Sequence, residues 1–148
     1  SKDDILNIVD ELKVKYEIVD NPSKKIANIL ASGSEVALFD LKMEFGPRAL
    51  GARSILAPAN DKTINDKLNN KLNRTEFMPF APVILQEHAR EYFPAWQEKH
   101  ITAHYMTITY DVSELAKQNI PAAVHVDNTA RPQVLRREDN PDYYEIIK

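Results

Sequence analysis

The sequence predicts an α/β fold, of the mixed α+β kind, in which a twisted mixed sheet is packed with helices. Segments with the spacing of amphipathic helices are interleaved with short apolar segments typical of strands. The chain has 148 residues, of which 43% are hydrophobic and 28% charged, and it contains no repeat, low-complexity tract or linker-like stretch. We therefore expect a single domain that spans residues 1–148.

The first segment is predicted to form a helix followed by a short strand. The helix covers residues 3–13, with Asp3 or Asp4 as its N-cap, and its apolar face consists of Ile5, Ile8, Val9 and Leu12. Alternation then indicates a strand near 14–18, with Val14, Tyr16 and Ile18 on one face.

A second helix and a second strand are expected next. Asn21 and Pro22 supply an N-cap and a first-turn proline, and Gly33 is a suitable C-cap. The apolar run at 36–39 is typical of a buried strand.

Glycine and proline interrupt residues 42–60, where we expect an irregular loop and one brief strand at 54–57. Thr63 then caps a helix that carries an apolar stripe and a basic stripe side by side. The stripes consist of Ile64, Leu68 and Leu72 and of Lys67, Lys71 and Arg74.

The remaining elements are predicted mainly by β-propensity. A strand at 80–85, interrupted early by Pro82, precedes a helix at 86–92, and the run at 105–110 is the strongest strand candidate in the chain. Further strands are expected at 122–126 and 133–135.

The composition excludes several kinds of site. Cysteine is absent, which rules out disulfides, zinc-thiolate sites, iron–sulfur clusters and thiol nucleophiles. No apolar run approaches the roughly 20 residues of a membrane helix, and the N-terminus resembles neither a signal peptide nor a start methionine. We expect a cytoplasmic protein that does not contact a membrane, and a chain that is part of a longer one.

The charge is unevenly distributed along the chain. The formal net charge is −3, yet residues 42–74 hold seven positive and three negative side chains, so the other 115 residues carry −7. A basic island in an acidic domain favours a local anion site over a nucleic-acid surface. A solvated charged face explains the same numbers equally well.

The histidines do not predict a metal site. His100 and His104 would reach one ion from a helix, but Ile101 cannot replace the glutamate of a metalloprotease helix. In an extended segment the two rings stand about 13 Å apart, which is too far to share an ion. His125 alone lies in a dense polar patch, at 125–131.

Glycine-rich nucleotide motifs are absent, so any phosphate would be held by arginine and lysine side chains. Three loop segments could supply these side chains, at 44–56, 71–82 and 125–131. Taken one at a time, Arg48, Arg53 and Arg131 could instead have a structural role, in a salt bridge to Glu44 or Asp127 or a hydrogen bond to a backbone carbonyl. The cations of the three segments are Arg48 and Arg53, Lys71 and Arg74, and Arg131.

Several stretches of the sequence match the motifs of one known family. They are Glu44-Phe45-Gly46-Pro47-Arg48-Ala49-Leu50-Gly51 with Arg53-Ser54-Ile55-Leu56, Pro79-Phe80-Ala81-Pro82, His125-Val126-Asp127 with Thr129-Ala130-Arg131, and Arg137-Glu138-Asp139-Asn140-Pro141. In this order and spacing they resemble the C-terminal domain of the NodU/CmcH-type O-carbamoyltransferases. The resemblance covers nearly the whole chain, and the first motif is long enough to be very specific.

The resemblance implies the smaller, YrdC-like part of a two-domain enzyme. In such enzymes this part forms carbamoyl-adenylate from carbamoyl phosphate and ATP, and Mg²⁺ accompanies the ATP. A separate N-terminal domain with an actin-like fold and an iron site then transfers the carbamoyl group to a hydroxyl, as in nodulation factors or the antibiotics cephamycin and tobramycin. The iron ligands and the acceptor pocket would lie in that other domain.

The resemblance also assigns roles to the cations. Arg48 and Arg53 would hold carbamoyl phosphate or nucleotide phosphates, with Lys71, Arg74 and Arg131 completing the cage, and Arg48, Lys71 and Arg131 are the expected catalytic residues. Substrate binding would further involve Thr129, with His125 and Asp127 orienting the segment or binding the carbamoyl amide.

Two positions depart from the usual family pattern. Met78 stands where many relatives have an arginine, which removes one possible phosphate ligand. Asn128 stands where glycine is usual, a milder change because asparagine tolerates left-handed backbone angles.

Two other functions stay open at this point. One is a non-catalytic module that holds a nucleotide or anion for a partner domain. The other is nucleic-acid binding, against which stand the net charge and the scarcity of aromatic residues in the basic window, where Phe45 is followed next by Phe77. The sequence identifies neither the acceptor nor the oligomeric state, and a homodimer is possible.

Overall fold

The computed structural model describes residues 2–40, 42–75 and 78–148 and has a mixed α/β fold, as predicted. The α-helices are α1 (Lys2–Glu11), α2 (Pro22–Ala31), α3 (Thr63–Lys71), α4 (Ala89–Tyr92), α5 (Glu114–Asn119) and α6 (Pro141–Ile147). The 3₁₀-helices are η1 (Gln86–His88), η2 (Ile101–Tyr105) and η3 (Pro121–Ala123). The strands are β1 (Val36–Phe39), β2 (Arg53–Leu56), β3 (Val83–Leu85), β4 (Tyr110–Asp111), β5 (Thr129–Ala130) and β6 (Gln133–Leu135).

The strands of the described residues pair as three short ribbons. β1 and β2 are antiparallel, and their register places Phe39 opposite Arg53. β3 and β6 are parallel, with Ile84 opposite Val134, and β4 and β5 are antiparallel. Parallel pairing joins segments that are far apart in the sequence, so β3–β6 connects the middle of the chain to its C-terminal part.

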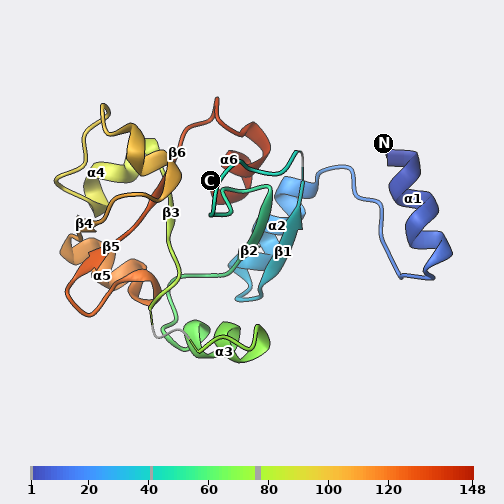
Figure 1. Cartoon of the computed structure of the whole chain (residues 1–148), viewed down its shortest axis with the longest axis horizontal. Coiled ribbons are helices and arrows are strands. Elements are labelled where there is room, and N and C mark those ends of the chain that lie inside the picture. Colours follow the sequence, from blue (N-terminus) through green and yellow to red (C-terminus); the bar gives the residue numbers. More distant parts are fainter. Residues whose placement is uncertain (1, 41, 76–77) are drawn as a thin grey trace.

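The ribbons divide the molecule into regions that meet at the parallel pair (Figure 1). Helices α2 and α6 lie beside β1 and β2, while α4 and α5 lie with β4 and β5 on the other side of β3 and β6. Helix α3 lies below them, and α1 stands apart at one end of the molecule. The apolar side chains of Ile5 and Ile8 on α1, and of Leu12 directly after it, are more than half exposed.

The core follows the alternation of side chains along β6. Val134 packs into a cluster with Phe93, Trp96 and Ala103, whereas its neighbour Leu135 packs into a second cluster, on the other face of the strand. The second cluster also contains Leu56, Leu85, Tyr143, Tyr144 and Ile146. A third, smaller cluster joins Ile64 and Leu68 of α3 to Ala122.

The predicted helices and strands of the first half are largely confirmed. Asn21 Oδ1 accepts the Lys24 N–H at 3.0 Å, Pro22 begins α2, and Gly33 follows the helix with a φ of 91°. Two caps differ from expectation, because Asp3 and Asp4 lie inside the first turn of α1 and Thr63 is itself the first residue of α3. The Thr63 N–H donates to Asp61 Oδ1 at 2.9 Å.

Three predicted strands are wrong. Residues 14–18 are irregular and exposed, because no neighbouring strand pairs with them among the described residues. In the run 105–110 only Tyr110 is in a strand, because Met106 has a left-handed φ of 53° and the chain turns so that Thr107 N–H reaches Thr102 O. The segment 122–126 begins instead with the 3₁₀-helix η3, which starts at Pro121.

Two α-helices of the described residues, α5 and α6, escaped the sequence analysis. Ser113 caps α5, and Asn140 Oδ1 accepts the Tyr143 N–H at 3.0 Å to cap α6, which Pro141 begins. The Asn140-Pro141 pair repeats the Asn21-Pro22 signal of α2, so α6 was predictable from the sequence. None of the helices in the described ranges combines the length and the apolar character that crossing a membrane requires.

Candidate anion-binding site

A cavity of about 620 Å³ lies between β2, α3 and the segment that ends in Arg131. Of the described residues that line it, the charged ones are all arginines, and they come from all three segments singled out in the sequence. They are Arg48, Arg53, Arg74 and Arg131. This arginine cavity therefore has a positive wall with no carboxylate among the described lining residues to neutralise it.

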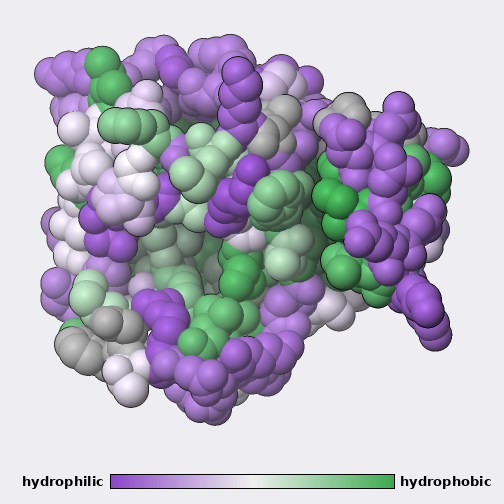
Figure 2. Space-filling view, turned by 45° about the vertical axis from the view of Figure 1, so that its right-hand side comes forward, coloured by the Kyte–Doolittle hydropathy of each residue, from purple (hydrophilic) through white to green (hydrophobic). Residues whose placement is uncertain are grey.

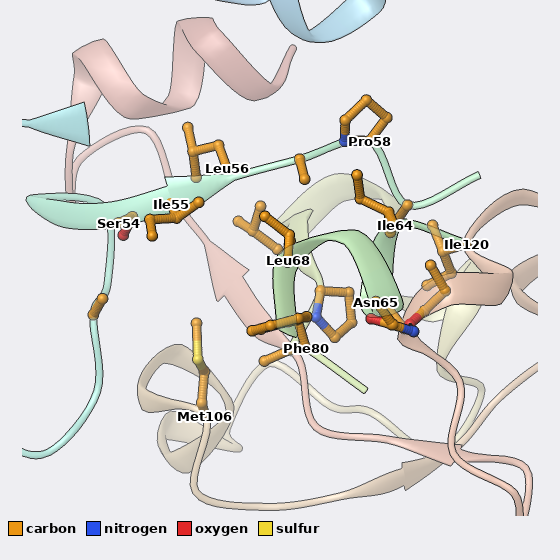
Figure 3. A pocket seen from close by; sticks show the side chains of 18 of the residues that line it. Ser54, Ile55, Leu56, Pro58, Ile64, Asn65, Leu68, Phe80, Met106 and Ile120 are labelled. Atoms are coloured by element: carbon orange, nitrogen blue, oxygen red, sulfur yellow. The ribbon is translucent and has the colours of Figure 1, made fainter. Parts of the chain in front are cut away.

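The rest of the arginine cavity is apolar. Figure 2 shows a hollowed face with hydrophobic side chains at its base and hydrophilic ones around it. In the close-up, Ile64 and Leu68 of α3, Phe80 and Ile120 surround the space, and Ser54 and Asn65 lie at opposite ends of the view (Figure 3). A cavity with an apolar base and a cationic rim suits a ligand that has both a flat apolar part and phosphate groups.

The loop that carries Arg48 and Arg53 is folded around the carboxylate of Glu44. Glu44 Oε1 accepts three backbone N–H groups, from Leu50 at 2.7 Å, Ala52 at 2.6 Å and Arg53 at 3.0 Å. Partial burial alone would raise the pKa of Glu44, but the backbone donors outweigh it and lower this pKa to about 2. Glu44 thus organises the loop by accepting hydrogen bonds from its backbone N–H groups.

The same loop is fixed from outside by α6 and β6. Gly51 lies against the ring of buried Tyr143 with a φ of 108°, and its N–H donates to Ser54 Oγ at 2.9 Å. Gln133 Nε2 donates to Leu50 O at 3.0 Å. The sequence analysis singled out neither Tyr143 nor Gln133, although the family motif at 137–141 lies between them.

The two loop arginines are in different situations. Arg53 Nη1 donates to Asp40 O at 2.6 Å and to Ala52 O at 2.8 Å, and its guanidinium lies 3.5 Å from the ring centre of Phe39. Arg53 therefore supports the β1–β2 ribbon, which agrees with the structural alternative of a bond to backbone carbonyls. Arg48 is half-buried and has no hydrogen bond or ion pair with the residues described.

The other two arginines, Arg74 and Arg131, also line the cavity and have unused hydrogen-bond donors. The guanidinium of Arg74 lies 4.6 Å from the ring centre of Phe80. Arg131 Nε is buried and has no hydrogen-bond partner within the described ranges. A buried guanidinium N–H without an acceptor is costly, and an anionic ligand would satisfy it.

Lys71 lies outside the arginine cavity. Its Nζ pairs with Glu35 Oε2 at 3.1 Å, and its side chain is 63% exposed. Two further residues of the second segment, Glu76 and Phe77, lie outside the described residues, and Met78 beyond them is exposed.

The third segment is a hydrogen-bonded turn that leads into Arg131. Asp127 Oδ1 accepts the N–H and the hydroxyl of Thr129, at 3.0 and 2.8 Å, and His125 Nδ1 lies 3.0 Å from the same hydroxyl. The bonds from Thr129 lower the pKa of Asp127. Asn128 occupies the left-handed region with a φ of 61°, as expected for a position where glycine is usual. His125 lines a neighbouring cavity with Lys62 and Lys117, apart from the arginine cavity.

His100 and His104 form hydrogen bonds within the fold. His100 directly precedes the 3₁₀-helix η2 and His104 lies within it, so neither the α-helical nor the extended geometry considered for the pair applies. His100 Nδ1 lies 3.0 Å from Tyr110 Oη, and buried His104 Nδ1 lies 2.6 Å from Val134 O. Within the described residues, no three His, Asp or Glu side chains are grouped to hold a metal ion.

Comparison with known proteins identifies a family that the sequence matches. Residues 27–148 match the family described as carbamoyltransferase C-terminus. Over 138 residues the chain is 39% identical to an uncharacterized protein of Methanocaldococcus jannaschii, covering 92% of this chain and 22% of that protein. It is 41% identical over 113 residues to nodulation protein U of Azorhizobium caulinodans, covering 76% of this chain and 20% of that protein.

A third relative is nodulation protein NolO of Bradyrhizobium diazoefficiens, 37% identical over 130 residues, which are 86% of this chain and 23% of that protein. The chain thus spans about a fifth to a quarter of the length of these curated relatives. The family match covers most of the chain and includes every segment that lines the arginine cavity. The chain therefore belongs to the carbamoyltransferase C-terminus family.

Proposed function

We propose that the chain binds carbamoyl phosphate and ATP in the arginine cavity and forms carbamoyl-adenylate there. The observation that carries this proposal is the convergence of four arginines from three segments on one cavity whose base is apolar. Both substrates are polyanions, and the apolar base offers a place for the adenine ring. The family membership supports carbamoyl transfer as the overall chemistry.

The arrangement suits adenylation on electrostatic grounds. When an oxygen nucleophile attacks the α-phosphate, negative charge moves onto the departing pyrophosphate, and fixed cations stabilise that charge without having to reorganise. Arg48 and Arg131 are the main ligands in this proposal, because each has unused donors beside the cavity. Arg74 and Arg53 add positive potential, with Arg53 already engaged by Asp40 O.

The remaining predicted residues take indirect roles. The turn of His125, Asp127 and Thr129 positions Arg131 and does not touch the substrates, and Lys71 stays outside the cage. Mg²⁺ would be bound through the phosphates and water, since no described carboxylate lines the cavity.

The atoms of the reaction balance only if water takes part. Water cleaves carbamoyl phosphate to carbamate and inorganic phosphate, and a carbamate oxygen then attacks the α-phosphate of ATP. The new bond joins carbamate to AMP, and pyrophosphate leaves. Transfer of the carbamoyl group to a hydroxyl acceptor, such as a nodulation factor or an antibiotic, would take place on another, actin-like domain of a longer cytoplasmic chain that holds the iron.

The test is the exchange of labelled pyrophosphate into ATP, dependent on carbamoyl phosphate and Mg²⁺. The chain should catalyse exchange, and Arg131→Ala should reduce it at least tenfold, because the departing charge loses a partner. Arg90→Ala is the matched control, since Arg90 is exposed on α4 and does not line the arginine cavity. Exchange that is absent, or that Arg131→Ala leaves unchanged, contradicts the proposal.

A non-catalytic nucleotide-binding module is the second candidate. The observation that favours it is the lack of any carboxylate, histidine or lysine among the described residues lining the cavity. ATP binding by calorimetry, lost in Arg131→Ala but without pyrophosphate exchange, would select this function. Binding of nucleic acid that falls steeply with salt would instead contradict both.

A further inference from the structure

We infer that Asn65 reads the base of the bound nucleotide and selects a purine that carries an amino group at C6. The inference rests on the proposed binding of ATP in the arginine cavity. Asn65 lies in the first half of α3 and lines the cavity. Nothing in the sequence patterns had drawn attention to it.

The amide of Asn65 is held in one orientation. Its Nδ2 donates to Ala122 O at 2.7 Å, which ties α3 to η3 and fixes Oδ1 as the free end. Oδ1 is buried and has no hydrogen-bond partner among the residues that the structure describes. An unpaired buried acceptor costs stability, so this atom is a ready acceptor for a ligand N–H.

The surroundings of Asn65 suit a purine ring rather than a phosphate. Its neighbours in the close-up are the apolar side chains of Ile64, Leu68, Phe80 and Ile120 (Figure 3). Ser54, which directly follows Arg53 in the sequence, lies on the other side of that view from Asn65. A nucleotide with its phosphates at the loop that carries Arg48 and Arg53 would extend its base along the apolar wall toward Asn65.

The chemistry of the free atom decides which base fits. The exocyclic amino group of adenine donates an N–H, which pairs with Oδ1. Hypoxanthine and guanine carry a carbonyl oxygen at the same position, which would face another acceptor and leave both unpaired. Sites that hydrogen-bond one substrate group reject the analogue lacking it because a buried polar atom is stranded.

The experiment compares three purine nucleoside triphosphates, each with Mg²⁺, by calorimetry on the chain. We expect ATP to bind about tenfold or more tightly than ITP, with purine riboside triphosphate, which has only hydrogen at C6, in between. In Asn65→Ala the ratio of the ITP and ATP dissociation constants should fall to near one. Asn70→Ala is the matched control, an exposed asparagine on the same helix that does not line the cavity, and it should keep the ratio.

The outcomes separate this inference from the proposed function. Equal affinities for ATP and ITP in the unaltered chain, or a ratio that survives Asn65→Ala, overturn the role of Asn65 while ATP binding stands. Failure of ATP to bind at all overturns the proposed function as well. Where Asn65→Ala does not fold, the assigned side-chain amide resonance of Asn65 in the unaltered chain decides: ATP should shift it strongly and ITP should not, and equal responses contradict the inference.

Discussion

Gly51 lies against the ring of Tyr143 so closely that a β-carbon at residue 51 would overlap the ring carbons, with Cε1 at 2.7 Å. Gly51 also has a φ of 108°, outside the range that other residues adopt readily. The contact joins the loop that carries Arg48 to the buried face of α6. We therefore expect Gly51→Ala to destabilise the chain by about 3 kcal/mol, from backbone strain and overpacking together, measured by urea unfolding.

Gly46 provides the matched control for this prediction. Its φ of 117° is similar, but a β-carbon there would meet nothing within 4 Å. Gly46→Ala should therefore cost only the backbone strain, about 1–2 kcal/mol. If the ring contact matters, Tyr143→Ala should destabilise the Gly51→Ala variant less than it destabilises the unaltered chain. Strictly additive changes in the free energy of unfolding would show that the contact contributes nothing.

Glu44 should make the stability of the chain depend on pH in the acid range. Its pKa is about 2 in the folded chain and near its ordinary value of 4.5 when unfolded. The folded state binds fewer protons, so the contribution of Glu44 is fully present above pH 4.5 and is lost as the pH falls toward 2. Glu44→Gln should lower stability at pH 7 by about 2 kcal/mol, since charge-assisted bonds to the loop are weakened.

The measurement for Glu44 is urea unfolding at a series of pH values. The difference between the unaltered chain and Glu44→Gln should shrink steadily below pH 4.5. Other carboxylates with lowered pKa values, such as Asp61 and Asp127, contribute equally to both curves and cancel in the difference. Two curves that stay parallel down to pH 2 would mean that the carboxylate is not what holds the loop.

Local signals in the sequence predicted the parts of the fold that local contacts determine. The caps of α2 and the apolar stripe of α3 were visible because both depend on residues within one or two turns. The strand predicted at 105–110 failed because β-propensity does not reveal that Met106 turns the chain out of an extended path. No pairing partner had been identified for 14–18, and none is described in the structure.

The candidate site was predictable as a set of arginines but not as a geometry. Arg48, Arg53, Arg74 and Arg131 do converge, whereas Lys71 turns to Glu35 and His125 to another cavity. A basic stripe on a helix gives no information about which way a flexible lysine points. Asn65 and Tyr143 escaped notice because their significance depends on contacts with Ala122 and Gly51, which are distant in the sequence.

Asn128 should tolerate glycine but not a β-branched residue. Its φ of 61° lies in the left-handed region, and its backbone N–H and C=O bond to His125 O and Val112 N–H. Asn128→Gly should change the stability by no more than about 0.5 kcal/mol, whereas Asn128→Val should cost about 2 kcal/mol. Thermal unfolding of both variants is the measurement, and equal losses would show that the side chain of Asn128, rather than its backbone angle, is what the turn requires.

Arg48 and Arg53 should separate ligand binding from stability. Arg53→Ala removes two bonds to backbone carbonyls and the contact with Phe39, so it should lower the free energy of unfolding by about 2–3 kcal/mol. Arg48→Ala removes no bond among the described residues and should cost under about 1 kcal/mol, mainly from packing of its methylene groups. Arg48→Ala should also weaken ATP binding at least tenfold, because the guanidinium of Arg48 is available to bind an anion. Urea unfolding measures the stability of each variant, and calorimetric titration measures its affinity for ATP. If Arg48→Ala unfolds the chain, while Arg53→Ala leaves it stable but abolishes ATP binding, the roles of the two arginines are the reverse of those proposed.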